Sequence, residues 1–323
     1  MSQAQHTAEI LVIGAGMAGL AAASDLKEAG KNVLVIDKAR GLGGRLANRR
    51  MDGAIAEHGA QFATTRSPRF QELMKRWEAR GFVEPWFHSL NGETESHPRY
   101  RGIPTMSAMA KQLGSGLDIM LSQRASKVAM SGNGWLTTLE SGETIFSKSV
   151  IISSPVPQTL ALLEAGNVAM LARDKALLEG VEYDPCIAVM ATLDQPSAIA
   201  APGALRFSEG PIDWIADNQA KGVSSKPAVT IHASADYSRD NWDRDRDEIA
   251  QELLAAASQQ LGAAVESYQE HAWLYSKPAA PVEQRYLVIS DKPMMVLVGD
   301  AFGGPKVEGA VLSGWAAAEA ILA

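Results

Sequence analysis

The chain has 323 residues, of which 46% are hydrophobic and 21% charged, a composition typical of a soluble globular protein with about two domains. Its formal net charge of −7 argues against nucleic-acid and anionic-membrane partners, which are bound by surfaces rich in lysine and arginine. The single cysteine, Cys186, excludes an intrachain disulfide and a cysteine-based zinc site, and the N-terminus lacks a signal-peptide pattern, so we expect a cytoplasmic protein without a metal.

The first predicted elements form a strand–helix–strand unit. A buried strand at Glu9–Ile13 is followed by the turn Gly14–Gly19 (GAGMAG), a helix over Leu20–Ala29 and a second buried strand, Asn32–Ile36, which ends at Asp37. In such a unit one glycine makes the tight turn, one lets the backbone approach a pyrophosphate and one packs the helix on the strand, while the acid binds a ribose. The pattern predicts a dinucleotide site, for FAD or NAD, made by Gly14, Ala15, Gly16, Ala18, Gly19 and Asp37.

A second glycine-rich segment, RGLGGRL, begins three residues after Asp37. An NAD site has no obvious need of this loop. A glycine-rich turn with an arginine after the second strand resembles the pattern of the flavoprotein amine oxidases, in which FAD lies extended across the domain. The resemblance implies an arginine at the pyrophosphate and adds four cofactor contacts: Lys38, Arg40, Gly44 and Arg45.

The segment AEHGAQF follows, and then a predicted helix over Pro68–Ala79 and strands within 84–104. In the same superfamily this segment is a backbone turn along the flavin, which implies contacts from Gln61 and Phe62. His58 is a candidate catalytic base, although a structural, hydrogen-bonding role is the more common one for such a histidine.

Strands are predicted at RASKVAM and within 135–155, where the chain returns to the cofactor-binding sheet at Ile151 or Ile152. The first of these resembles the superfamily strand whose valine, here Val128, contacts the adenine through its backbone. Residues from about 158 to 290 should form helices and an antiparallel sheet, with a helix that ends at Gly262 and strands at CIAVMATL, AVTIHASA and SYQEHAWLYS.

Near the C-terminus a buried strand, Met294–Val298, is followed by Asp300, a glycine-rich turn and a helix that begins near Val307. This resembles the closing FAD motif of the superfamily, in which the aspartate binds the ribitol chain and the helix N-terminus faces the flavin pyrimidine. Ribitol occurs in FAD and not in NAD, so the resemblance implies FAD. The turn AFGGPKV contains no cysteine, so we expect the FAD to be non-covalent.

Together these elements predict an α/β fold, α+β overall. A Rossmann-like FAD-binding domain (residues 1–85, 100–157 and 288–323) would carry an inserted mixed-sheet substrate domain (residues 86–99 and 158–287).

Within the superfamily, the chain resembles the renalases and renalase-like bacterial NAD/FAD-dependent oxidoreductases. The residues that carry the resemblance are the opening GAGMAG, GLGGRL, HGAQF, HAWLYS and VGDAFGGPKVEGAVLSG. The resemblance implies an oxidase that converts 2- or 6-dihydro isomers of NAD(P)H to NAD(P)⁺ by hydride transfer to the flavin, with O₂ reduced to H₂O₂. Asp37 departs from the glutamate of many relatives, a change that the ribose contact should tolerate.

A flat nicotinamide ring could lie between aromatic side chains on the predicted strands, and substrate phosphate could meet an arginine near residue 66. The candidate substrate residues are Trp214, His232, Trp273, Tyr275 and Arg69, with Arg66 also considered; core packing or simple exposure are the competing roles. Because hydride transfer is centred on the flavin, we expect no catalytic protein residue.

Three alternatives remain: an FAD-dependent amine oxidase or desaturase, a non-catalytic flavin-binding redox sensor, and an ordinary NAD dehydrogenase. Hydrolases and kinases are excluded by the absence of GxSxG, P-loop and zinc-ligand patterns.

Overall fold

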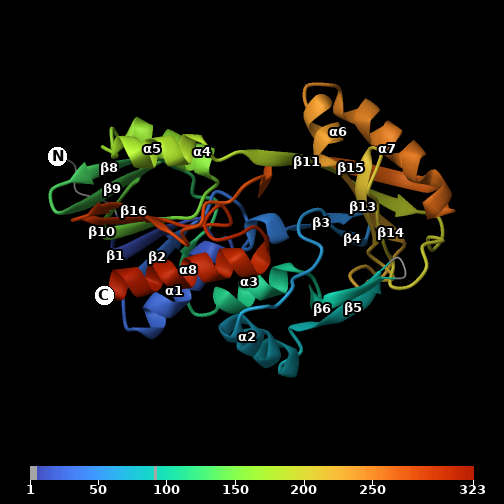
Figure 1. Cartoon of the computed structure of the whole chain (residues 1–323), viewed down its shortest axis with the longest axis horizontal. Helices are drawn as coiled ribbons and strands as arrows, with labels where there is room; N and C mark the ends of the chain where they lie inside the picture. Colours follow the sequence, from blue (N-terminus) through green and yellow to red (C-terminus); the bar gives the residue numbers. More distant parts are fainter. Residues whose placement is uncertain (1–5, 91–92) are drawn as a thin grey trace. The chain divides into compact units, whose positions relative to one another are not determined.

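The computed structural model describes residues 6–90 and 93–323, and the chain forms two compact units (Figure 1). Unit 1 comprises Met1–Gly44, Ala110–Glu182 and Lys277–Ala323. Unit 2 comprises Arg45–Met109 and Tyr183–Ser276. Each unit is therefore discontinuous in sequence and has a sheet of its own.

The boundaries of these units differ from the expected domain boundaries. Residues 45–85 and 100–109, expected in the cofactor-binding domain, belong to unit 2, whereas residues 158–182 and 277–287 belong to unit 1. Part of the reason is a small apolar cluster in which Met51 and Ala56 of a hairpin pack on Met190 of the unit 2 sheet.

Unit 1 is built on a sheet with the strand order β16-β17-β10-β1-β2-β7, and β9 and β8 continue from β10. Strands β17, β10, β1, β2 and β7 are parallel to one another, so their carboxyl ends share one edge. The strands are β1 (His6–Ile13), β2 (Val33–Ile36), β7 (Asp118–Met120), β8 (Ala125–Ser131), β9 (Gly134–Leu139), β10 (Thr144–Ile152), β16 (Leu287–Asp291) and β17 (Met294–Leu297).

Strand β1 lies at the centre of this sheet, between β2 and β10, and its register determines which residues meet at the carboxyl ends of the strands. Residues 10–13 of β1 are buried, as expected of a strand covered on both faces. In the register of the sheet, Ile13 lies beside both Ile36 and Ile152. The residues that follow these three, namely Gly14, Asp37 and Ser153, therefore come together at one edge.

Helices cover both faces of this sheet, with α1 and α8 side by side on one face and α4 and α5 on the other (Figure 1). The close approach of α1 and α8 depends on Gly314, because a Cβ there would lie 2.1 Å from the carbonyl oxygen of Ala18. The helices are α1 (Met17–Glu28), α4 (Val156–Ala165), α5 (Ala172–Glu179) and α8 (Lys306–Leu322), and the boundary between the two units falls within α3 (Ser107–Leu113).

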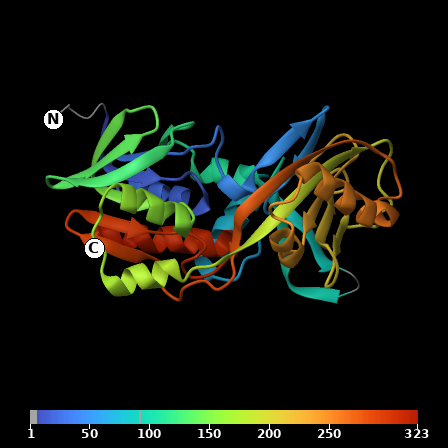
Figure 2. The same ribbon diagram turned by 90° about the horizontal axis from the view of Figure 1, so that it is seen from above.

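Unit 2 contains a sheet with the strand order β12-β13-β14-β11-β15 and two hairpins, β3–β4 and β5–β6. The long strands β11 and β15 run side by side (Figure 2). The strands are β3 (Asn48–Met51), β4 (Ala54–Glu57), β5 (Val83–Leu90), β6 (Glu93–Gly102), β11 (Tyr183–Leu193), β12 (Ala204–Arg206), β13 (Ile212–Asp217), β14 (Ala228–Ala233) and β15 (Val265–Pro278). The helices are α2 (Pro68–Ala79), α6 (Ala235–Asp240) and α7 (Arg246–Leu261).

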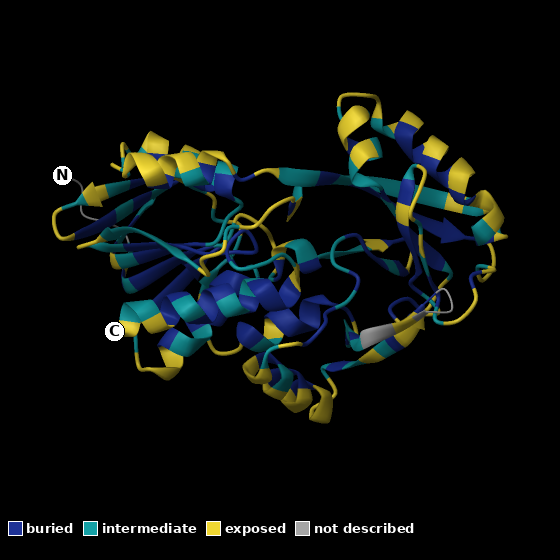
Figure 3. Cartoon of the chain, viewed as in Figure 1, coloured by how far each residue is buried: buried dark blue, intermediate teal, exposed yellow. Residues whose placement is uncertain are grey.

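The two faces of this sheet differ in chemistry. Alternate residues of β11 and β14, such as Val189 and Ile231, pack with Leu253 of α7, whose buried stripe is visible in Figure 3. The alternate register places Trp214 opposite His232 on the other face. The α7 face is therefore a hydrophobic core, and the other face carries aromatic and polar side chains.

The expected element types are observed, with local shifts. Helix α2 occupies the expected range, Pro68–Ala79. Helix α1 starts at Met17, three residues before the expected start, because the extended residue Gly16 is its N-cap. The polar run before Gly262 forms two helices, α6 and α7, because Asp245 caps α7 by accepting hydrogen bonds from the N–H groups of residues 247 and 248. Among the described residues, no helix has the length and apolar character needed to cross a bilayer.

Candidate functional site

The glycine turn of unit 1 has the geometry of a dinucleotide-binding turn. Gly14 has a φ of +110°, which glycine adopts readily and other residues rarely do. A Cβ on Gly19 would lie 2.0 Å from the Gly14 carbonyl oxygen, so the helix approaches the turn only because Gly19 lacks a side chain. A Cβ on Gly16 would meet no described atom within 4 Å, which leaves its backbone open to a phosphate. The residues present thus fit a dinucleotide.

The N-terminus of α1 is suited to an anion. Its N-cap, Gly16, makes no side-chain capping hydrogen bond, and its first turn contains no acidic residue. The first N–H groups of a helix have no intrahelical acceptor, and the helix dipole adds partial positive charge there. The predicted ligands Ala15 and Ala18 are both buried in this turn, so their contribution to a ligand would come from the backbone.

Asp37 lies at the carboxyl end of β2 and holds the turn. Its Oδ2 accepts a hydrogen bond of 2.6 Å from the Ala15 N–H, and its Oδ1 accepts one of 2.7 Å from the Ala39 N–H. The Gly43 N–H donates to the Ala15 carbonyl oxygen over 2.8 Å. The structure therefore brings the two glycine-rich segments together.

The other predicted residues of the second segment lie in different surroundings. Lys38 donates from Nζ to Oε1 of Gln158 on α4 over 3.1 Å, and desolvation, with a smaller contribution from Arg124, lowers its pKa. Arg40 and Gly44 are exposed. Lys38 is thus held against α4, whereas Arg40 is exposed in the loop.

The segment that follows β17, which contains Gly299 and Asp300, reaches the same edge of the sheet and lies next to Ser153. The Ser153 Oγ donates to the carbonyl oxygen of Gly14 over 3.0 Å, and a Cβ on Gly299 would lie 3.9 Å from the Ser153 carbonyl oxygen. Asp300 follows Gly299 directly and is buried. The sequence reasoning did not identify Ser153, although its position directly after a buried strand could have suggested it.

The N-terminus of α8 is built like that of α1. A Cβ on Gly309 would lie 2.0 Å from the carbonyl oxygen of Gly304, so the glycine-rich turn packs tightly on the first helical turn. Pro305 is the N-cap and makes no side-chain capping hydrogen bond. The predicted Val307 is buried in this first turn.

Val128 lies in β8 and is fully buried. A Cβ on Gly166, at the C-cap of α4, would lie 1.6 Å from the Val128 carbonyl oxygen, so the end of α4 packs directly on this part of the strand. The contact of Val128 with adenine stays a prediction.

In unit 2, the HGAQF segment forms a turn that is held from several sides. Arg45 accepts a hydrogen bond of 2.8 Å at its carbonyl oxygen from the Ala60 N–H. Its guanidinium donates to the carbonyl oxygens of Tyr275 and Ser276 over 3.2 and 2.9 Å. The Arg45 side chain is thus directed at β15, and its contact with a pyrophosphate stays a prediction.

Lys221, which was not predicted from the sequence, contacts the HGAQF turn. Its side chain is fully buried, and its Nζ lies 2.6 Å from Oε2 of Glu57 and donates to the Gln61 carbonyl oxygen over 2.5 Å. Desolvation lowers the pKa of Lys221, while Glu57 raises it. Nothing local in DNQAKGV distinguishes this lysine from an exposed one.

Two aromatic clusters lie on the sheet face opposite α7. In the first, Phe62 and Trp214 have ring centroids 5.6 Å apart and are joined by Trp86 and Phe87. The structure thus brings together two predicted residues, one expected at the cofactor and one at the substrate.

The second cluster, which we call the histidine–tryptophan cluster, consists of His58, His232, His271 and Trp273. The His58 ring lies 5.4 Å from the Trp273 ring, nearly parallel to it, and 4.7 Å from His271. The Trp273 indole donates to the His58 carbonyl oxygen over 2.8 Å. Two ring nitrogens, Nδ1 of His58 and Nε2 of His232, are buried without a hydrogen-bond partner.

The remaining predicted substrate residues are Tyr275, Arg66 and Arg69. Tyr275 makes an edge contact with Tyr183, with ring centroids 5.4 Å apart. Arg66 and Arg69 are exposed at the start of α2.

The histidines of the cluster are neutral at physiological pH. Desolvation, followed by the positive fields of His271, Arg49 and His232, lowers the pKa of His58 to about 3. Desolvation lowers the pKa of His232 to about 4, although a hydrogen bond to the backbone of His58 acts in the opposite direction and raises this pKa. For His271 too, desolvation lowers the pKa.

These shifts predict an acid-sensitive fold. Below pH about 6.5 the unfolded chain takes up protons on His58 and His232 while the folded chain does not, so stability should fall as the pH falls toward about 4. Between pH 7 and pH 5 the loss should be about 2 kcal/mol for each of His58 and His232. Urea unfolding at both pH values measures it, and His232→Leu should reduce the loss. The exposed His88 provides the control, because His88→Gln should leave it unchanged; equal wild-type stability at the two pH values would contradict a neutral cluster.

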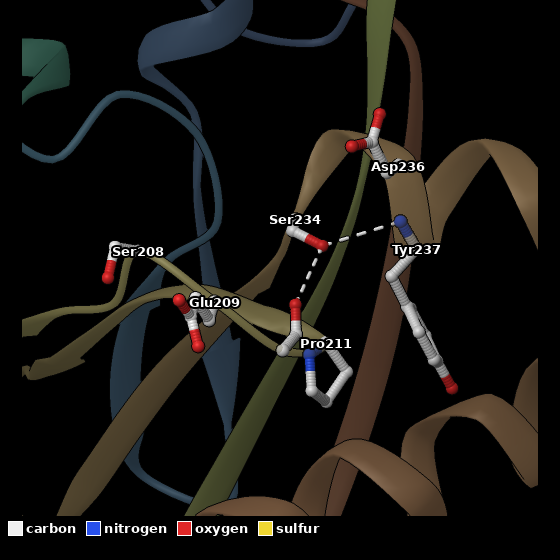
Figure 4. A pocket seen from close by; sticks show the side chains of 7 residues that line it. Ser208, Glu209, Pro211, Ser234, Asp236 and Tyr237 are labelled. Carbon is white, nitrogen blue, oxygen red and sulfur yellow. Dashed lines mark hydrogen bonds between the residues drawn. The ribbon is translucent and has the colours of Figure 1, made fainter.

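Unit 2 also has a surface hollow of about 560 Å³ between the turn at residues 208–211 and the start of α6 (Figure 4). Ser234 and Tyr237 line it, and the Ser234 Oγ accepts from the Tyr237 N–H over 3.3 Å. None of the predicted site residues lines the hollow, so it is not the candidate site. Within residues 6–90 and 93–323, no group of three or more His, Cys, Asp or Glu side chains is arranged to hold a metal ion.

Comparison with known proteins agrees with this geometry. The family of NAD(P)-binding Rossmann-like domains matches residues 12–77, and the flavin containing amine oxidoreductases match residues 84–322. The structure of wild-type putrescine oxidase bound to putrescine is similar, with a TM-score of 0.66 and 16% identity over 98% of this chain and 99% of that chain. A protein assigned as protoporphyrinogen oxidase from Exiguobacterium sp. 255-15 has a TM-score of 0.73 and 13% identity over 99% of both chains. At such identities the likeness to these structures shows the fold.

Proposed function

Because this chain belongs to the flavin containing amine oxidoreductase family, we propose that it is an FAD-dependent oxidase of dihydronicotinamides. It is a flavoprotein oxidoreductase with a Rossmann-like domain, and its cofactor is FAD. The proposed substrates are the 2- or 6-dihydro isomers of NAD(P)H. The proposed products are NAD(P)⁺ and, after the electrons pass to O₂, H₂O₂.

For unit 1 we propose that the adenosine and pyrophosphate parts of FAD bind at the Gly14–Gly19 turn, at Asp37 and at the RGLGGRL segment that begins with Arg40. The fit rests on the open backbone at Gly16 and the uncapped N-terminus of α1. Asp300 directly follows Gly299, which lies close to the Ser153 carbonyl oxygen, and we propose that Asp300 binds the ribitol chain. The one cysteine of the chain, Cys186, lies in β11, far in sequence from the closing motif, which supports non-covalent binding.

When bound, FAD supplies the hydride acceptor and the route of the electrons to oxygen, and the protein supplies orientation and electrostatics. The proposed substrate contacts are the aromatic and histidine side chains of unit 2, with Arg66 and Arg69 for phosphate.

The observation that carries the proposal is the neutral character of the histidine–tryptophan cluster. A dihydronicotinamide ring is flat and uncharged, so it suits aromatic faces and neutral imidazoles. An aliphatic diamine is cationic and calls for an unpaired carboxylate. Among the described residues of unit 2, the buried carboxylates are Glu57, paired with Lys221, and Asp217, which accepts from Ser197 and two backbone N–H groups.

The proposal is tested by mixing the FAD-loaded protein aerobically with NADH preparations enriched in the 2- or 6-dihydro isomers. We expect bleaching of the flavin absorbance, formation of NAD⁺ and one H₂O₂ per substrate oxidised. Putrescine and protoporphyrinogen serve as parallel substrates. Bleaching by either of these alone would establish another oxidase function, and no bleaching by any of them would favour a non-catalytic flavin protein.

A further inference from the structure

The buried ion pair of Lys221 and Glu57 connects segments that are far apart in the sequence of unit 2. Lys221 lies in the loop between β13 and β14, and Glu57 ends β4. The second carboxylate oxygen of Glu57 accepts a hydrogen bond from the Met106 N–H, and the Glu57 N–H donates to Asn218 Oδ1 over 3.2 Å. One ion pair therefore joins the Glu57–Gln61 turn to two other segments.

A pair this deeply buried needs a reason to be retained. The side chains are 0% and 1% exposed, and the ammonium lies 4.4 Å from the centre of the Trp86 ring. Removing two charges from water costs several kcal/mol per ion, roughly what the attraction between them returns. Apolar side chains of similar volume often stabilise such a site as well. What apolar side chains could not do is hold the polar groups that the pair contacts, the Gln61 carbonyl and the Met106 N–H.

In the Glu57–Gln61 turn, most of the backbone carbonyl groups already accept hydrogen bonds from protein groups. The Gln61 carbonyl accepts from Lys221 over 2.5 Å, and the His58 carbonyl accepts from Trp273 over 2.8 Å. The carbonyls of Glu57 and Gly59 accept from the Gln61 side-chain amide over 2.6 and 3.0 Å. The N–H groups of Glu57 and Ala60 also have acceptors, Asn218 Oδ1 and the Arg45 carbonyl oxygen. What such a turn can still offer to a ligand is therefore its other backbone N–H groups, which suit a hydrogen-bond acceptor.

The polar edge of a flavin ring consists largely of acceptors, its carbonyl oxygens and unprotonated ring nitrogens. We infer that Lys221 is a positioning residue that holds the Glu57–Gln61 turn with its N–H groups toward such acceptors, and so strengthens the hold of the protein on the flavin ring. The inference rests on the proposed function and on the expectation from the sequence that Gln61 of this turn contacts FAD. Lys221 acts through the backbone of Gln61 and needs no contact with FAD itself.

The test compares Lys221→Met/Glu57→Gln, which removes both charges while keeping side-chain volume, with the matched control Lys226→Met. Lys226 lies in the same loop but is exposed, and its Nζ donates to the Asp52 carbonyl oxygen. In the double variant we expect FAD to bind at least about tenfold more weakly, the visible flavin spectrum to shift, and the flavin to be reduced less readily by a dye of known potential. The control should match the wild type in all three.

An unchanged FAD affinity, spectrum and dye equilibrium in a folded double variant would overturn the inference. If the double variant does not fold, the wild type decides it: FAD should slow amide hydrogen exchange in the peptide that spans residues 58–62, and an FAD-loaded protein without this protection would overturn the inference as well. Failure of the proposed function has a different signature. A wild type that holds FAD but oxidises no dihydronicotinamide refutes the substrate and leaves the role of Lys221 to be decided by the three flavin readouts.

Discussion

Replacing Gly19 by alanine is expected to destabilise unit 1 and abolish the retention of FAD. The new methyl carbon would lie 2.0 Å from the Gly14 carbonyl oxygen and 2.8 Å from the Ser153 Oγ. The first of these atoms belongs to the backbone of the turn, which cannot move without displacing the end of β1. Overpacking of this kind costs about 1–3 kcal/mol, and sometimes more, in the free energy of unfolding. Urea unfolding and flavin absorbance after gel filtration measure the two effects.

Gly16→Ala separates the two effects. Gly16 has φ −80° and ψ 177°, which alanine adopts, and its Cβ would meet no described atom within 4 Å. Its stability without added FAD should stay within about 0.5 kcal/mol of the wild type. Its FAD affinity should fall at least about tenfold, because the methyl group would stand where the phosphate approaches. Gly180→Ala, at the helical C-cap of α5, should change neither quantity. FAD binding by Gly16→Ala with wild-type affinity would contradict the placement of the phosphate.

Much of unit 1 could be predicted because its determinants are local. The order of strand, glycine turn, helix, strand and acid lies within residues 6–37, and each glycine has a conformational or steric reason that composition and spacing reveal. Near the C-terminus, the apolar run and the glycine-rich turn after it likewise indicated β17 and α8. What local patterns could not show is the contact of Ser153 with Gly14, because it joins residues 139 positions apart.

In unit 2 the candidate site depends almost wholly on contacts between distant segments. Lys221 and Lys226 lie five positions apart in one polar loop, and only the fold buries the first and exposes the second. The hairpin β3–β4 was expected in the cofactor-binding domain, yet it packs on β11 through Met51 and Met190. Pattern and propensity say which segments are strands, but they do not say which sheet a hairpin joins.

The Lys221→Met variant alone is expected to lose about 3–5 kcal/mol in the free energy of unfolding. The substitution leaves the Glu57 carboxylate 1% exposed with no cation at 2.6 Å, although Met106 still donates to its other oxygen. Adding Glu57→Gln removes the unpaired charge, so the double variant should recover most of the loss and lie within about 2 kcal/mol of the wild type. The two substitutions should therefore be strongly non-additive.

Urea unfolding of the wild type, both single variants and the double variant at pH 7 measures this coupling. FAD stabilises whatever state binds it by mass action, so each protein is compared at two FAD concentrations to separate affinity from intrinsic stability. Lys226→Met should stay within about 0.5 kcal/mol of the wild type, since its ammonium is exposed. Additive losses from Lys221→Met and Glu57→Gln would mean that the two charges do not stabilise each other. The cost of losing Lys221 would then come from its contacts with Trp86 and the Gln61 carbonyl.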